Sequence, residues 1–134
     1  SCYNTIPMVP LHTLNLVFDH LLKAGGVGAQ EKINIEKAEK LYAVLDKYSL
    51  EGTIEKKFVK LTVSKQFRSK MNVVFNLKSV DLENDFVKKA EAKGFSAIKG
   101  HRSVGGIRIS IYNAVKLEAV ETLIKFIEEF AQQL

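Results

Sequence analysis

A regular alternation of apolar and polar residues near the C-terminal end places the strongest constraint on the fold of this 134-residue chain. Isoleucine occupies every second position from Ile107 to Ile111, and polar side chains, beginning with Arg108, occupy the positions between. Successive side chains of a strand point to opposite faces of its sheet, so the pattern predicts a strand with one buried and one open face. The buried face requires a second layer of structure to cover it.

Two helices are predicted before the sheet. The first has apolar residues at helical spacing between positions 14 and 22 and stops at Gly25-Gly26, while Pro7 and Pro10 keep residues 1–10 extended. The second begins near residue 29, and its two faces differ in polarity. Its apolar face consists of Ile33, Ala38, Leu41, Tyr42 and Leu45. Its solvated face consists of Glu31, Lys32, Glu36, Lys37, Glu39 and Lys40.

The rest of the chain is predicted to form a small sheet domain. The expected elements are a strand at 71–77, a helix from Ser79 to Gly94, a strand at 96–99, a strand at 107–112 and a helix from 117 onward. The fold is therefore α/β of the α+β kind, with two N-terminal helices followed by a βαββα sheet domain whose helices pack on one face. We divide the chain into a helical segment, residues 1–60, and this domain, residues 61–134.

The composition excludes several classes of protein. The chain has 46% hydrophobic and 26% charged residues, which is typical of a globular domain, and it has no apolar run of membrane-spanning length. Its net charge of +5 favours anionic partners, either small phosphorylated molecules or nucleic acid. Cys2 is the single cysteine, so an internal disulfide is excluded and a reducing compartment is expected. Ser1 is not a natural start, and we expect an initiator methionine or a longer segment before it.

The residues around the Gly105-Gly106 pair have the chemistry of an anion-holding loop. His101 and Arg102 precede the pair, and Arg108 follows it on the predicted open face. A guanidinium offers two parallel donors to a carboxylate or phosphate, an imidazole titrates near neutral pH, and glycines let a ligand approach closely. A solvated sheet face without any ligand explains the spacing of Arg108 equally well, so both interpretations stay open.

Other stretches carry weaker signals. Asn4 and Thr5 either start a turn or present an amide and a hydroxyl to an anion. The basic stretch at residues 56–70 contains no nucleic-acid-binding motif. No third ligand lies near His12 and His20 in the sequence, so we assign them no metal.

Longer stretches of the sequence resemble the phosphoserine aminotransferase family, which are pyridoxal-phosphate enzymes of class V, fold type I. The C-terminal end of that family is similar to KGHRSVGGIRISIYNAVKLEAVETLIKFIEEF, residues 99–130. The first strand of its small domain is similar to FRSKMNVVFNL, residues 67–77. The segment leading into that domain is similar to YNTIP, LNLVFDHLLKAGG and EKAEKLYAVLD. The resemblance thus covers nearly the whole chain, and HRSVGGIR with SIYNA is highly specific.

The resemblance implies an enzyme of serine biosynthesis that moves an amino group between L-glutamate and 3-phosphohydroxypyruvate, forming phosphoserine. It implies a cytoplasmic homodimer with pyridoxal 5'-phosphate as cofactor, and no nucleic-acid or membrane partner. By the family pattern, Arg108 would bind the substrate α-carboxylate, and His101 and Arg102 would help to hold the phosphate or the distal carboxylate. Asn4 and Thr5 would reach across the dimer interface to the cofactor phosphate of the neighbouring subunit.

The chain departs from the family pattern at two positions and in its extent. Ile6 and Lys116 stand where the family usually has proline, and neither position touches the implied contacts. The family's Schiff-base lysine lies in a large domain earlier in the chain, and its sequence context is absent around Lys23, Lys32 and Lys99. We therefore assign no catalytic residue and expect a C-terminal fragment that is inactive alone.

Two further functions stay open on the sequence. One is a free-standing module that binds an amino acid or a phosphorylated metabolite, and the other, ranked lowest, is a basic nucleic-acid-binding domain. Titration of the isolated chain with phosphoserine, glutamate and short oligonucleotides separates these functions, because a ligand that binds only the folded state raises its melting temperature.

Overall fold

The structure, a computed structural model, describes residues 3–52 and 54–134. Our expectations for Ser1 and Cys2 therefore fall outside the described residues. The chain divides into two compact units, Ser1–Ile33 and Asn34–Leu134. The division that we predict at residue 60 concerns a link to a larger domain, and it stays a prediction. No helix in the described part of the chain combines the length and apolar content that crossing a bilayer requires.

The first unit contains helix α1, Met8–Lys23, and the beginning of helix α2, Gly26–Lys47. Helix α1 begins two residues before Pro10, inside the stretch that we predict to be extended. A proline fits the first helical turn because the N–H groups there have no intrahelical acceptor. None of the side chains of α1 is buried, and Leu14 and Phe18 on its predicted apolar stripe are 46% and 53% exposed.

Within the described residues, the second unit contains a three-stranded antiparallel sheet with helices against one face. The strands are β1, Val59–Lys60, β2, Asn72–Leu77, and β3, Ile107–Ser110, in the spatial order β1-β2-β3. Helix α3, Val80–Ala92, follows β2, helix α4, Leu117–Gln132, follows β3, and a short 3₁₀ helix, η1, spans Lys65–Phe67. The predicted α+β class is confirmed.

One predicted strand is replaced by another. Residues 96–99 do not form a strand; their one bridge in the described part of the chain joins Lys99 to Ile107. Ala97 has a φ of 56°, in the left-handed region that an extended strand does not use. The third strand is β1 instead, which lies in the basic stretch at residues 56–70 and pairs Val59 with Leu77 of β2.

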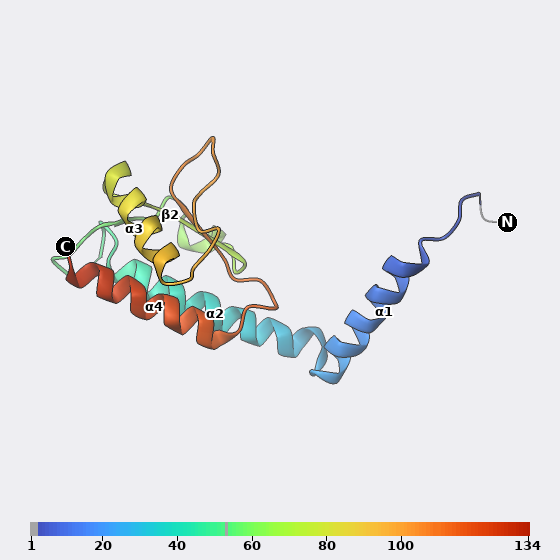
Figure 1. The fold of residues 1–134 in the computed structure, drawn as a ribbon. Helices are drawn as coiled ribbons and strands as arrows, with labels where there is room; N and C mark the ends of the chain where they lie inside the picture. The colour runs from blue at the N-terminus through green and yellow to red at the C-terminus, as the bar shows by residue number, and fades with distance from the viewer. Residues whose placement is uncertain (1–2, 53) are drawn as a thin grey trace. The chain divides into compact units, whose positions relative to one another are not determined.

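The core lies between the sheet and helices α2, α3 and α4. The three alternating isoleucines, at 107, 109 and 111, are at most 5% exposed, which confirms that their face is the buried one. Phe86 of α3 stands at the centre of the aromatic packing, with ring centroids 5.0 Å from Phe126 and Phe130 of α4. Helices α2 and α4 run side by side in the same direction, and two ion pairs spaced seven residues apart, Lys40–Glu121 and Lys47–Glu128, join them (Figure 1).

The polarity of helix α2 differs from the prediction at two positions. Ala38, Leu41 and Leu45 are buried as expected, but Ile33 is 46% exposed. Lys37, which we assign to the solvated face, is fully buried, with 0% of its surface exposed. The prediction was wrong because it inferred exposure from charge alone. The buried position of Lys37 contains carbonyl acceptors for its ammonium group, which are described below.

Candidate functional site

The register of β2 and β3 builds a polar patch on the open face of the sheet. Cross-strand partners of an antiparallel pair share a face, and the pairs here are Val74 with Arg108 and Asn72 with Ser110. Arg108 is exposed, while Ile107 and Ile109 on either side of it are buried. The alternation predicted from the sequence therefore places Arg108 on the uncovered face.

The guanidinium of Arg108 is available to a ligand. Among residues 3–52 and 54–134, no hydrogen bond or ion pair engages this side chain. A hollow of about 460 Å³ lies beside β3, between residues 94–98 and the start of α4, and buried residues such as Ile109 and Leu123 line it together with Arg108. On the open face, a guanidinium with unused donors can receive a carboxylate or phosphate in two parallel hydrogen bonds.

Two hydroxyl groups next to Arg108 converge on one amide. The Ser110 Oγ donates to Asn72 Oδ1 at 3.1 Å, and the Tyr112 hydroxyl donates to the same oxygen at 3.3 Å. These bonds tie the end of β3 to the start of β2 on the open face. We did not assign Ser110, Tyr112 or Asn72 from the sequence, although the alternation already places the first two on the face of Arg108.

His101 and Arg102 lie in an exposed loop that the backbone closes just before β3. The Gly100 N–H donates to the Gly106 carbonyl at 2.8 Å, and the Gly105 N–H donates to the His101 carbonyl at 2.8 Å. The Nδ1 of His101 is 2.7 Å from the Ser103 Oγ, while no partner engages Arg102 in the described part of the chain. The same hairpin thus carries Arg108 in its strand and the histidine and arginine pair in its loop.

Gly106 is required by both its backbone angle and its surroundings. Its φ is +72°, and a Cβ atom there would lie 2.6 Å from Asn76 Nδ2 and 2.8 Å from the Phe75 carbonyl oxygen. Gly105 has a similar φ of +75°, but a Cβ atom there would meet no atom within 4 Å. A side chain at Gly105 would therefore only strain the backbone, whereas a side chain at Gly106 would also clash with β2.

We expect Gly106→Ala to destabilise the chain more than Gly105→Ala. The left-handed backbone costs each alanine on the order of 1–2 kcal/mol, and only Gly106→Ala adds the clash with β2. Denaturant unfolding of the two variants measures the difference in free energy of unfolding. Equal losses in the two variants would show that β2 and the loop do not contact each other at Gly106.

A buried lysine holds the segment that follows β3. The Lys37 Nζ donates to the carbonyl oxygens of Ile111, Tyr112 and Val115, at 3.2, 2.9 and 3.0 Å. Burial lowers the pKa of this ammonium group below its ordinary value. Nothing in the sequence distinguishes Lys37 from the exposed lysines of the same helix, so the sequence could not identify it.

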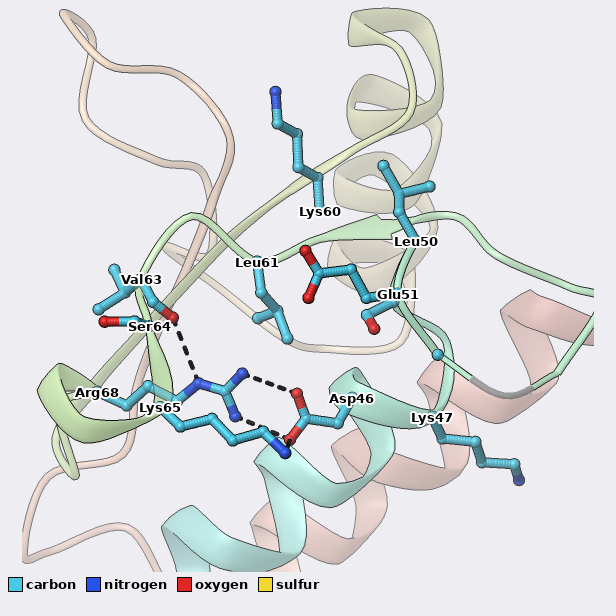
Figure 2. A pocket seen from close by; sticks show the side chains of 12 residues that line it. Asp46, Lys47, Leu50, Glu51, Lys60, Leu61, Val63, Ser64, Lys65 and Arg68 are labelled. Atoms are coloured by element: carbon cyan, nitrogen blue, oxygen red, sulfur yellow. Dashed lines mark hydrogen bonds and ion pairs between the residues drawn. The ribbon is translucent and has the colours of Figure 1, made fainter.

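A second hollow, of about 860 Å³, lies beside the C-terminal end of α2 (Figure 2). Arg68 contributes to its wall, but its guanidinium binds both carboxylate oxygens of Asp46, at 2.7 and 2.8 Å. The Arg68 guanidinium also lies 4.8 Å from the ring centre of Tyr42. Figure 2 shows Lys60 pointing away from this pair. Because its arginine is already neutralised, this hollow is a weaker anion site than the face of Arg108.

The Asp46–Arg68 pair makes stability depend on acid pH. The hydrogen bonds from Arg68 hold the pKa of the Asp46 carboxyl below its ordinary value of 3.8. The folded state therefore binds this proton less readily than the unfolded state, and the stabilisation is present above pH 3.8 and is lost as the pH falls through the lower folded-state pKa.

We expect the free energy of unfolding of the wild-type chain to fall by on the order of 1 kcal/mol more than that of Asp46→Asn over this range. Denaturant titrations at stepped acid pH measure this loss, with Glu91→Gln, an exposed carboxylate of α3, as the control. Parallel losses in wild type and Asp46→Asn would contradict the assignment.

The remaining predicted residues lie apart from this patch in the sequence and belong to the first unit. Asn4 and Thr5 are exposed residues before α1, so their amide and hydroxyl are free to face solvent or a partner. Lys23 and Lys32 are exposed as well, as is Lys99 near the loop. Within the described residues, no group of three or more His, Cys, Asp or Glu side chains has metal-binding geometry.

Comparison with known proteins shows which proteins this chain resembles. No family model matches the chain. The phosphoserine aminotransferase of Saccharomyces cerevisiae is 50% identical over 133 residues, which are 99% of this chain and 32% of that protein. The chain is homologous to phosphoserine aminotransferases. The phosphoserine aminotransferase of Shewanella halifaxensis is 45% identical over 131 residues, 98% of this chain and 34% of that protein.

Solved phosphoserine aminotransferase structures share the fold. The enzyme from Bacillus circulans subsp. alkalophilus matches with a TM-score of 0.87 and 39% identity, covering 98% of this chain and 34% of that one. The PLP-bound phosphoserine aminotransferase from Trichomonas vaginalis matches with a TM-score of 0.80 and 31% identity, covering 94% and 34%. The chain thus spans about a third of the length of these phosphoserine aminotransferases, and its fold matches their C-terminal domain.

Proposed function

We propose that this chain is the C-terminal part of a phosphoserine aminotransferase that transfers an amino group between L-glutamate and 3-phosphohydroxypyruvate in serine biosynthesis. The observation that carries the proposal is an arginine with no partner among the described residues, on the open sheet face of a chain that is 50% identical to such an enzyme. The longer protein would be a homodimer of the cytoplasm.

In this proposal Arg108 binds the α-carboxylate of the substrate. Its two parallel donors fix the orientation of the carboxylate, and the hydroxyls of Ser110 and Tyr112 keep the neighbouring surface polar. The loop residues His101 and Arg102 bind the phosphate or the distal carboxylate, which places cationic or donor groups at both ends of a substrate with two anionic groups. Two anion-binding groups at a set distance favour substrates whose two anionic groups are separated by a matching distance.

Pyridoxal 5'-phosphate is the cofactor of the proposed enzyme, and it would act as the electron sink of the transamination. Asn4 and Thr5 fit a contact with its phosphate, because they offer an amide and a hydroxyl on exposed backbone. They would reach the cofactor of the neighbouring subunit. Residues 1–60 would then link a large domain, which carries the reactive lysine, to the small domain at residues 61–134.

The test is a transaminase assay on the longer protein encoded upstream of and including this chain. Purified protein with pyridoxal phosphate should convert phosphoserine and 2-oxoglutarate into 3-phosphohydroxypyruvate and glutamate. A reading frame that begins immediately before Ser1, together with a thermal shift of the isolated chain by phosphoserine, would support the alternative of a free-standing metabolite-binding module instead.

A further inference from the structure

The side chain of Lys37 is buried, and no carboxylate among residues 3–52 and 54–134 pairs with it. Its exposed fraction is 0%, and the three hydrogen bonds of its ammonium group all go to backbone carbonyls, those of Ile111, Tyr112 and Val115. An ammonium group has three protons, so each of them has an acceptor. Burying a charge without an opposite charge is costly, whereas a methionine of similar length would fill the same space without that cost. The role of the ammonium group therefore lies in its hydrogen bonds, which an apolar side chain cannot make.

What it does is fix a backbone segment that has no regular structure of its own. Ile111 directly follows β3, and residues 111–115 make up most of the connection between this strand and α4. The Asn34 side chain, one helical turn before Lys37, donates to Asn113 Oδ1 at 2.8 Å. Two residues on one face of α2 thus hold the same five-residue segment, at its backbone and at one of its side chains.

The held segment leads directly to the open face that carries Arg108. The Tyr112 backbone carbonyl accepts from Lys37, and the hydroxyl of the same residue donates to Asn72 on the neighbouring strand. The Ile111 N–H donates to the Met71 carbonyl at 2.8 Å, which continues the pairing of β3 with β2. A displacement of this segment would therefore move Tyr112 and loosen the end of the strand on which Arg108 stands.

We propose that Lys37 is a positioning residue for the anion site at Arg108, which it reaches through the backbone of Ile111–Val115. The inference rests on the proposed function, because it assumes that Arg108 binds the substrate carboxylate. Lys37 does not touch the substrate. It sets the end of β3 and the position of Tyr112 so that the guanidinium meets the carboxylate at hydrogen-bonding distance.

The experiment compares steady-state constants of variants of the full-length aminotransferase. Lys37→Met removes all three donors, and we expect it to raise the KM for L-glutamate and for phosphoserine about 10-fold with a smaller change in kcat. Lys37→Gln keeps two donors on a side chain that is one bond shorter, and it should lie between wild type and Lys37→Met. Lys40→Met is the matched control, because Lys40 is on the same helix and pairs with Glu36 and Glu121 at the protein surface.

The pattern of constants separates positioning from stability. Reversible unfolding raises the apparent KM of a variant, because only the folded fraction binds substrate, so the KM values are compared at a temperature at which the melting curve shows each variant to be fully folded. Unchanged KM values in Lys37→Met would therefore overturn the proposal, and Lys37→Gln carries the same test if Lys37→Met yields no folded protein. Arg108→Ala is measured alongside: if it leaves KM and kcat unchanged, the carboxylate site itself is wrong. If Arg108→Ala impairs binding and the Lys37 variants do not, only the role of Lys37 fails.

Discussion

Replacing Arg108 by alanine in the full-length aminotransferase is expected to lower kcat/KM about 30- to 1000-fold. The change removes the proposed bidentate, charge-assisted contact with the substrate carboxylate, which we estimate to contribute about 2–4 kcal/mol to transition-state binding. Arg108→Lys should recover only part of the loss, because an ammonium group cannot reproduce the two parallel donors of a guanidinium. Steady-state kinetics with phosphoserine and with L-glutamate measure both variants.

Because Arg108 is exposed, the effect of its replacement on kinetics can be separated from an effect on stability. Its side chain makes no hydrogen bond or ion pair within the described part of the chain, so its removal should leave the melting temperature nearly unchanged. Lys88→Ala, which removes an exposed cation from α3, is the control for net charge. Near-wild-type kcat/KM in Arg108→Ala would refute the α-carboxylate role, whatever the effect of the other variants.

The isolated 134-residue chain is expected to have no measurable transaminase activity. Covalent catalysis with pyridoxal phosphate needs a lysine held in a cofactor pocket, and none of Lys23, Lys32 and Lys99 has the family's sequence context. All three are exposed, so nothing about them favours reaction with the cofactor over reaction of any surface lysine. We expect no turnover of phosphoserine with 2-oxoglutarate when pyridoxal phosphate is supplied.

A labelling measurement makes the same prediction independent of turnover. The chain is incubated with pyridoxal phosphate and reduced with borohydride, and its peptides are analysed by mass spectrometry. We expect low labelling spread over surface lysines, in contrast to one stoichiometric site in a full-length phosphoserine aminotransferase treated in parallel. A single lysine labelled to completion, with turnover, would show that this chain contains a complete catalytic site.

The parts of the fold that the sequence predicted well are those set by periodicity. The alternation around Ile109 predicted which face of β3 is buried, and the Ser79 cap was correct, since its side chain accepts from the Leu82 N–H at 3.3 Å. The open-face position of Arg108 followed from the same alternation. In each case the decisive information lies within a few residues of the position concerned.

The parts that the sequence did not predict depend on partners far away in the chain. The acceptors of Lys37 lie 74 to 78 residues beyond it, so the helical pattern around it gave no sign of burial. The Asp46–Arg68 pair and the Asn72 contact with Tyr112 likewise join residues 22 and 40 positions apart. The strand expected at 96–99 failed for a local reason, the left-handed Ala97, but alanine does not signal that conformation.

The burial of Lys37 also gives the molecule an internal reporter of its own motion. Amine-reactive reagents modify exposed lysines such as Lys88 directly, whereas Lys37 is reached only when α2 separates from the Ile111–Val115 segment. Its labelling rate therefore measures how often this region opens, and the rate of Lys88 corrects for reagent chemistry. The labelling of one lysine, measured by mass spectrometry, can thus show how far cofactor, substrate or a second subunit reduces the opening of this region, without any engineered probe.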